Sequence, residues 1–460
     1  MANDLEILEL EISSENYDTG HQFLPQEIER HNVDNISYND FYWEYMENNI
    51  PVVLCNVSKH WECRKWIKTP REASNGCHDN PSPIFNTPHD GTGKSINYDY
   101  LKEKIGNLMV PTADCNREYF NSHAKSEMLF FDFLNYWQQK REDDGPTDAS
   151  NRDKSTDLLY LKDWHLKAQR MDYNFYDVPK HFASDWLNEH LVLTESDDYR
   201  FVYMGPKDTW TPFHSDVFGS FSWSTNIMGI KKWLLLPPGE ELKLSDTLGN
   251  LPFSIDEKLL NEHNVRYYTL MQSENESLFV PSGWYHQVWN TTDTISINHN
   301  WFNACNLKRI WFNLSQQMQR VVAEIDDCRQ MDNFTEHCQT MLRASFGLNY
   351  LDFLQLLQTI STRRLGKYNN NNTAADLSAN PTPPEYTATT TSSKLIFFEH
   401  YIPNDYHIQH DLERILQVVE LMLQDSVICD DRIVLYRKCI QLKESLIPSL
   451  SSNSKQSLSE

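Results

Sequence analysis

Residues 211–239 read TPFHSDVFGSFSWSTNIMGIKKWLLLPPG, and a second segment, residues 279–290, reads FVPSGWYHQVWN. In both segments, short runs of apolar and aromatic residues alternate with polar residues and end at Gly, Pro, Asn or Asp. This pattern is typical of β-strands that are joined by tight turns. Because no long helical stretch interrupts these runs, they favour a β-barrel or sandwich over a parallel α/β sheet.

The same strand-like texture extends over residues 158–303, with further runs such as YRFVYM and TISINHNWF. Upstream of it, residues 37–48 predict a helix with Ser37 as its N-cap, residues 51–54 a buried strand, and residues 132–139 a second helix. Residues 1–30 are polar and acidic and predict a flexible arm. Residues 71–95 predict a loop, and residues 140–157 a charged, exposed insertion. A first domain over residues 31–305 follows from these boundaries, and the resemblance described below implies that it is the catalytic domain.

Beyond this domain the hydrophobic period becomes helical, as in NLSQQMQRVVAEIDD. Residues 306–365 are therefore expected to form a helical extension. Residues 366–396 are low in complexity and predict a disordered linker. A last pair of helices, near residues 412–424 and 431–446, lies within a unit at 397–448, and a serine-rich tail at 449–460 follows. The predicted fold class is mainly β with α.

The charge balance restricts the class of partner. The chain of 460 residues has 41 Lys and Arg against 65 Asp and Glu, a formal net charge of −24. Such a surface repels nucleic-acid phosphates and anionic lipid headgroups, so we expect neither nucleic-acid nor membrane binding. A basic protein partner is electrostatically easier, although acidic surfaces also serve solubility alone.

The nine cysteines are scattered and never form C-x-x-C, which predicts neither a disulfide framework nor a zinc knuckle. The N-terminus lacks a secretory pattern, and no run of about 18 apolar residues is present. These features predict that the protein resides in a reducing compartment, either the cytoplasm alone or the cytoplasm and the nucleus.

One H-x-D sequence occurs in the chain, at His214 and Asp216, inside the strand-rich block. Residues two apart on a strand project from the same face, so an imidazole and a carboxylate could reach one metal ion. His286 in the second segment adds another imidazole. Two histidines and a carboxylate leave open positions on Fe(II), where a keto acid and then O2 can bind. Zinc would accept these ligands too, and an isolated histidine is more often a core residue.

Lys231 is a candidate partner for the distal carboxylate of such a keto acid. Strand alternation prevents Lys231 and Lys232 from both pointing inward. A strand lysine taken alone would be a solvated edge charge. Hydroxyl or amide hydrogen bonds to the same acid could come from Tyr160, Thr211 and Asn298.

The two segments quoted first resemble the jumonji-C (JmjC) family of the cupin superfamily. This resemblance implies a double-stranded β-helix (cupin/jelly-roll) core, with N-terminal α/β elements before it and C-terminal helices after it. It also implies a dependence on Fe(II), on 2-oxoglutarate as co-substrate and on O2. His214, Asp216 and His286 match the metal ligands of the family, which are also its catalytic residues. Lys231 matches its co-substrate lysine.

Three further strings narrow the resemblance: VPTADCNREYF at 110–120, LLYLKDWH at 158–165 and FASDWLNEH at 182–190. They are similar to the jumonji domain-containing protein 4 subfamily over residues 38–303. Its members are regarded as lysyl hydroxylases that act on the eukaryotic translation termination release factor. The resemblance therefore implies a 2-oxoglutarate-dependent dioxygenase with a protein substrate. Tyr160 and Thr211 fall at co-substrate contacts of related members, whereas Ser224 and Asn298 differ from the Asn and Thr found in some of them.

Several alternatives stay open at this point. The same chemistry could demethylate lysine, and the domain could be a non-catalytic scaffold or, less in keeping with Lys231, a zinc hydrolase. Asp185 could meet a substrate ammonium or cap a helix. Trp164, Trp186 and Trp284 could form a substrate platform but are more typical of a core. The sequence does not decide the oligomeric state or the modified lysine.

Overall fold

The computed structural model describes residues 8–13, 26–69, 93–120, 122–143, 157–376, 401–427 and 434–451. Most of the expected loop at 71–95, most of the insertion at 140–157 and most of the linker at 366–396 therefore lie outside the described residues. Within them, every cysteine is free. No helix in these ranges is long and apolar enough to cross a membrane.

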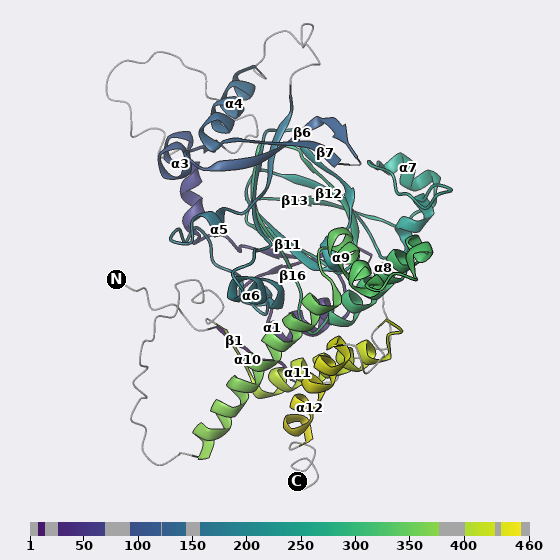
Figure 1. Cartoon of the computed structure of the whole chain (residues 1–460). Coiled ribbons are helices and arrows are strands. Elements are labelled where there is room, and N and C mark those ends of the chain that lie inside the picture. The colour runs from purple at the N-terminus through teal and green to yellow at the C-terminus, as the bar shows by residue number, and fades with distance from the viewer. Residues whose placement is uncertain are drawn as a thin grey trace.

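Two sheets form the centre of the described chain (Figure 1). The larger sheet has nine strands in the described ranges. Their order is β2 (Glu29–Asn32), β3 (Val52–Cys55), β14 (Glu276–Val280), β11 (Phe221–Met228), β16 (Thr294–Trp301), β9 (Arg200–Gly205), β8 (Leu159–Trp164), β6 (Met109–Tyr119) and β7 (Ser122–Leu129). The smaller sheet has the order β10 (Trp210–His214), β15 (Tyr285–Asn290), β12 (Lys231–Leu236) and β13 (Tyr268–Gln272). This arrangement, together with the strand-rich core between residues 158 and 303, confirms the predicted jelly-roll.

Strands β11 and β16 show how the sequence builds a barrel with a polar interior. Most of their polar residues lie on one face, because they alternate along each strand and pair across the ladder. These residues are Ser222, Ser224, Asn226, Ser296, Asn298 and Asn300. The opposite face is mainly apolar, with Thr225 and His299 as its polar residues, and joins the largest hydrophobic cluster through Phe221, Trp223, Ile295, Ile297 and Trp301. Nearly every residue of the two strands is buried, so the polar face lies inside the protein.

N-terminal elements cover the apolar face. The predicted first helix is confirmed, with the Ser37 hydroxyl accepting from the Asp40 N–H at 3.0 Å. It begins as α1 (Tyr38–Asp40) and continues as a π-helical segment, Phe41–Glu47. The predicted buried strand at 51–54 is β3. Further helices are α3 (Tyr98–Ile105), α4 (Phe130–Asp143), α5 (Leu166–Gln169) and α6 (Trp186–Leu193). The short pair β4 (Ile67–Lys68) and β5 (Ser95–Ile96) joins the same cluster, whereas helix α7 (Glu257–Glu262) packs through Leu260 in a separate cluster with residues of the smaller sheet.

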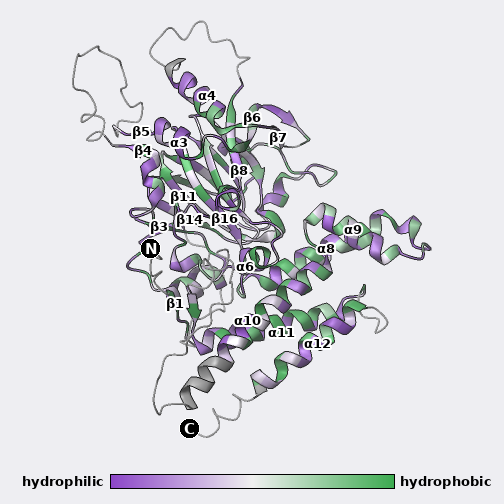
Figure 2. Cartoon of the chain, turned by 60° about the vertical axis from the view of Figure 1, so that its left-hand side comes forward, coloured by the Kyte–Doolittle hydropathy of each residue, from purple (hydrophilic) through white to green (hydrophobic). Residues whose placement is uncertain are grey.

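Five helices follow the barrel in the described ranges: α8 (Leu307–Glu324), α9 (Phe334–Phe346), α10 (Tyr350–Asp376), α11 (Asp405–Gln424) and α12 (Val434–Ser451). Figure 2 shows hydrophobic and hydrophilic residues mixed along them, as in amphipathic helices. Their apolar sides share one cluster that also takes in Trp186 and Phe218 of the catalytic domain. The predicted boundary at residue 366 is wrong, since α10 continues to Asp376. Residues 366–376 hold Lys, Tyr, Asn and Ala, which a helix tolerates once packing upstream has nucleated it.

The expected flexible arm at residues 1–30 also needs correction. Strand β1 (Leu8–Leu10) pairs in parallel with β17 (Tyr401–Pro403), which precedes α11. Asn404 fixes the junction: its backbone N–H donates to the Leu10 carbonyl at 3.0 Å, and its side-chain amide donates to the Ile12 carbonyl at 2.9 Å. Residues 8–12 read LELEI, an alternation of apolar and polar residues that is typical of a strand, but the partner strand lies almost 400 residues away in the sequence.

A buried ionic network joins α10, α11 and α6. The Arg364 side chain is fully buried, and its Nε donates to Asp411 Oδ2 at 2.6 Å. The Tyr401 hydroxyl accepts from Arg364 at 3.2 Å and donates to Glu189 Oε2 at 2.5 Å. The other Asp411 oxygen lies 3.2 Å from His407 Nδ1. Every charge in this network depends on a neighbour because water is excluded.

Arg364→Ala is therefore expected to lower the free energy of unfolding by about 3–5 kcal/mol, the cost of leaving a buried partner charge uncompensated. Chemical denaturation of the full chain measures it. Lys258→Ala is the control, because the Lys258–Glu262 pair is largely exposed. A double substitution, Arg364→Met with Asp411→Leu, should recover part of the loss. Equal unfolding midpoints for Arg364→Ala and Lys258→Ala would contradict the assignment.

Candidate metal centre

Neighbouring strands bring the two candidate histidines together. His214 on β10 and His286 on β15 are directly paired residues, and their ring centroids are 4.3 Å apart. The β10 ladder shifts register between Thr211 and His214, where Pro212 has no N–H to donate. This bulge lets Thr211 and His214, three residues apart, face the same side of the sheet.

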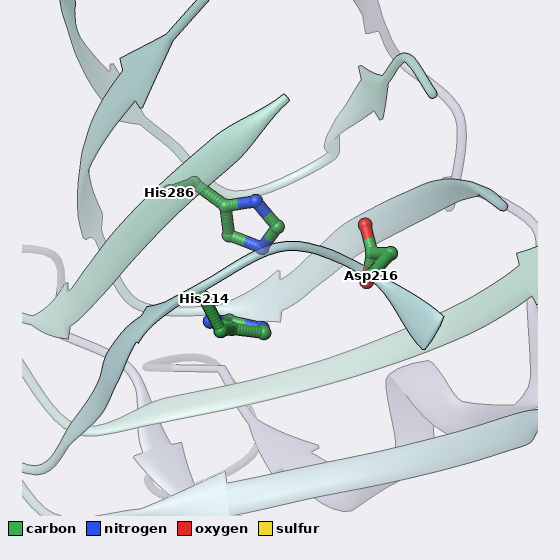
Figure 3. A group of neighbouring side chains, drawn as sticks. All are labelled: His214, Asp216 and His286. Carbon is green, nitrogen blue, oxygen red and sulfur yellow. The ribbon is translucent and has the colours of Figure 1, made fainter. Parts of the chain in front are cut away.

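Asp216 completes the group, although it does not lie on the strand as predicted. Strand β10 ends at His214, and Asp216 precedes a short 3-10 turn, Val217–Gly219. Its backbone remains extended, with φ −64° and ψ 146°. The geometry expected of residues two apart is thus retained past the strand end. One ligand atom from each of the three side chains lies within 4.8 Å of the others, and Figure 3 shows the carboxylate opposite the two rings.

Hydrogen bonds orient all three side chains. His214 Nδ1 lies 2.8 Å from the Pro212 carbonyl, and His286 Nδ1 lies 3.0 Å from the Trp284 carbonyl. A carbonyl only accepts, so each Nδ1 carries a proton, and in the neutral ring the lone pair that can bind a metal ion then lies on Nε2. Burial and the neighbouring His286 lower the pKa of His214 to about 3, so its ring is neutral at physiological pH.

The carboxylate of Asp216 is held from two sides. Its Oδ2 accepts from the Ser222 hydroxyl at 2.7 Å, and its Oδ1 accepts from the Asn300 amide at 2.8 Å. Both partners belong to the polar face of β11 and β16. Hydrogen bonds of this kind fix a metal-binding carboxylate before the metal arrives.

Lys231 lies inside the barrel and Lys232 outside it, as alternation requires. Lys231 is only 2% exposed, and its ammonium donates to the Ser296 hydroxyl at 2.6 Å. Lys232 instead pairs with Glu257 at 2.8 Å on the outer side. Burial, followed by the charge of Lys162, lowers the pKa of Lys231 to about 7. Lys231 is therefore a buried cation without a carboxylate partner in the described ranges.

The structure places the other three candidates around this lysine and the histidines. The Asn298 amide donates to the same Ser296 hydroxyl at 3.3 Å. Tyr160 on β8 is 2% exposed and hydrogen-bonds Asn290, the residue paired with Lys231 across the ladder. Thr211 shares its sheet face with His214 and is paired with Val288.

Four residues near the site are absent from the sequence-based prediction: Ser222 and Asn300, which hold Asp216; Ser296, which holds Lys231; and Tyr203, whose ring lies 5.7 Å from the Lys231 ammonium. Alternation along β11 and β16 carried a signal, since serine and asparagine recur at every second position of otherwise apolar strands. That signal predicts a polar barrel interior, but it does not predict which of these side chains hydrogen-bonds Asp216 or Lys231.

A second group of possible ligands, His165, Asp197 and Asp198, differs in kind. His165 Nδ1 lies 2.8 Å from Asp198, and the other Asp198 oxygen binds Arg200 at 2.8 Å. Because Arg200 already neutralises Asp198, this group is an internal ion-pair network.

The structure decides two of the alternatives that the sequence left open, the role of Asp185 and that of three tryptophans. Asp185 caps α6, with its carboxylate accepting from the Asn188 N–H at 2.9 Å, which confirms the capping interpretation. Trp164, Trp186 and Trp284 are core residues, each at most 1% exposed.

The residues present fit a facial metal site. Two imidazoles and one carboxylate supply three ligands, and the donor set suits Fe(II) that must keep positions open for a chelating co-substrate. The buried ammonium of Lys231 is suited to the far carboxylate of a dicarboxylate such as 2-oxoglutarate. Both features belong to the same barrel interior.

Comparison with known proteins agrees with this chemistry. The model of the family described as "JmjC domain, hydroxylase" matches residues 201–301. The Drosophila melanogaster protein named "2-oxoglutarate and iron-dependent oxygenase JMJD4 homolog" is 52% identical, over 90% of this chain and 92% of its own length. The Danio rerio protein named "2-oxoglutarate and iron-dependent oxygenase JMJD4" is 35% identical over 85% of each chain.

A third relative bears on the reaction. The Arabidopsis thaliana protein named "Arginine-specific demethylase JMJ20" is 35% identical over 74% of this chain and 71% of its own length. Its name states a demethylation, whereas the names of the two JMJD4 relatives state an oxygenase. The chain therefore belongs to the JmjC family and, within it, to the JMJD4 group of 2-oxoglutarate and iron-dependent oxygenases.

Proposed function

We propose that His214, Asp216 and His286 bind Fe(II), that Lys231 binds 2-oxoglutarate, and that the enzyme hydroxylates a lysine of another protein, the translation termination release factor. The observation that carries the site assignment is the convergence of three oriented ligands beside a buried, unneutralised ammonium. Burial of an ammonium that has only a hydroxyl partner is costly unless an anion joins it.

Each residue then has a defined task. The carbonyls of Pro212 and Trp284 keep Nε2 of both histidines available, and Ser222 and Asn300 hold the carboxylate of Asp216. Lys231 would neutralise the distal carboxylate, while Asn298 and Tyr160 would add hydrogen bonds to it. When bound, Fe(II) and 2-oxoglutarate supply oxidising power: one oxygen atom of O2 enters the substrate, the other enters succinate, and carbon dioxide leaves.

The proposed substrate rests on different support. The strings at 110–120, 158–165 and 182–190 resemble a subfamily regarded as lysyl hydroxylases of the release factor. The net charge of −24 favours a basic protein segment over a nucleic acid or an anionic membrane. A cytoplasmic location, with or without a nuclear pool, accords with such a partner and with the scattered cysteines.

The test is incubation of the full chain with the purified release factor, Fe(II), 2-oxoglutarate and O2, followed by peptide mass spectrometry. We expect one oxygen atom to be added to an unmethylated lysine. The gain should disappear without 2-oxoglutarate and with the His214→Ala variant. If the release factor stays unmodified while succinate forms with another protein, the substrate assignment is wrong and the oxygenase assignment stands.

The second candidate is demethylation, favoured by the relationship to the Arabidopsis protein named as an arginine-specific demethylase. Hydroxylation of an N-methyl group releases formaldehyde, so the same site could perform it. Methylated and unmethylated forms of one peptide separate the two reactions. Loss of methyl groups with formaldehyde release, and no oxygen gain on the unmethylated peptide, would replace hydroxylation by demethylation.

A further inference from the structure

The loop that follows Asp216 has an unusual backbone. Phe218 adopts φ 62° and ψ −4°, and Gly219 follows with φ 70°. A left-handed conformation is ordinary for glycine but strained for phenylalanine. Such a residue persists only where its surroundings hold it, and it lies here two positions after a proposed metal ligand.

Residues of the helices after the barrel, together with Tyr199, keep Phe218 in this conformation. Phe218 is 4% exposed, and its ring lies edge-on to Tyr199 at 5.2 Å and near Phe346 at 5.8 Å. Phe346 ends α9, and Gly347 follows it with φ 89°. A Cβ added to Gly347 would lie 2.7 Å from Cε1 of Phe218, so the ring rests directly on the glycine. Any larger residue would push the ring and the loop behind it.

The neighbouring glycine is held in the same way. A Cβ on Gly219 would collide with the side-chain amide of Asn313 on α8. From the barrel side, the Ser282 hydroxyl donates to the Gly219 carbonyl. The loop is therefore fixed between the barrel and the helices α8 and α9, which lie beside the barrel in Figure 1.

We infer that the helical extension positions the metal-binding carboxylate, through the contact of Gly347 and Phe346 with Phe218. Ser222 and Asn300 orient the carboxylate of Asp216, but the position of the Asp216 backbone depends on the loop that follows it. Phe218 and Gly347 are thus positioning residues for the metal. This inference rests on the proposed metal site and goes beyond it, because it gives helices far from the ligands a role in metal affinity.

The test compares two alanine substitutions in the full chain. Gly347→Ala and Gly249→Ala carry the same backbone penalty, because both glycines have positive φ, but nothing lies within 4 Å of a Cβ at Gly249. Affinity for Mn(II), a redox-stable substitute for Fe(II), is measured by calorimetry on protein shown by circular dichroism to be folded. We expect Gly347→Ala to weaken binding about tenfold, as changes that disturb the orientation of metal ligands do. Gly249→Ala should bind as the unmodified chain does.

A compensating variant separates positioning from general damage. Phe218→Leu shortens the side chain that a methyl group at position 347 would strike, so adding it to Gly347→Ala should recover part of the metal affinity. Phe218→Leu alone covers the case in which Gly347→Ala does not fold, and it should weaken Mn(II) binding moderately. Unchanged affinity in the folded Gly347→Ala and Phe218→Leu proteins would overturn the inference. Failure of the unmodified chain to bind Mn(II) would instead refute the site itself.

Discussion

His214→Ala is expected to abolish succinate formation that depends on protein substrate, iron and O2. His214 supplies one of three proposed ligands, and its Nδ1 hydrogen bond to Pro212 shows that the ring is fixed with Nε2 available. Because disturbing only the partners of metal ligands costs about 10–100-fold in affinity or activity, loss of a ligand should cost at least that much. Mn(II) calorimetry should show a parallel loss of metal binding.

The matched control is His263→Ala, since His263 lies exposed at the end of α7. Its activity and metal affinity should equal those of the unmodified chain. If His214→Ala retained turnover, His214 would not be a ligand, and the pairing of β10 with β15 would have a structural role only. A variant that lost turnover but kept full metal affinity would place His214 in a different catalytic task.

Lys231→Ala should raise the 2-oxoglutarate concentration needed for half-maximal turnover by about tenfold or more. A hydrogen bond to a charged group contributes roughly 1.5–3 kcal/mol, and each 1.4 kcal/mol is about a factor of ten. Steady-state kinetics at saturating protein substrate measure it. Lys232→Ala is the control from the adjacent position, because Lys232 points outward to Glu257. The 2-oxoglutarate concentration for half-maximal turnover could instead change in Lys232→Ala and not in Lys231→Ala. That result would show that the inward and outward faces of β12 are assigned the wrong way round.

The same lysine predicts a pH dependence. Burial lowers the pKa of Lys231 to about 7, so without co-substrate the ammonium loses its proton as the pH rises through that value. Only the protonated form attracts the distal carboxylate, and binding above pH 7 must therefore take up a proton. Between pH 7 and 9 the apparent dissociation constant should rise, by at most about tenfold for each pH unit. In Lys231→Ala this dependence should vanish. A flat profile in the unmodified chain would mean that another cation binds the carboxylate.

The candidate site was largely predictable because its signals are local or carried by long motifs. The spacing of His214 and Asp216 predicted a shared orientation, and it survives although β10 ends at His214. Alternation predicted that one of two adjacent lysines would point inward. The motifs of the JmjC family then identified which histidine, some 70 residues later, belongs with them.

Other features had no local signal. The partners of Asp216 come from β11 and β16, and the tie between β1 and β17 joins segments from opposite ends of the described chain. The strained loop at Phe218 is in contact with Gly347, which lies on a different structural unit. Each of these contacts joins residues that no pattern along the chain connects.

The sequence alone therefore determined the fold class, the family and the residue types of the candidate metal centre, because strand period, turn residues and motif spacing act over a few residues. The tertiary structure decided which side chains meet across strands, how the candidate metal ligands are oriented, and where the C-terminal helices contact the barrel. Those outcomes depend on sheet order, ladder register and close packing, which are properties of the whole folded chain.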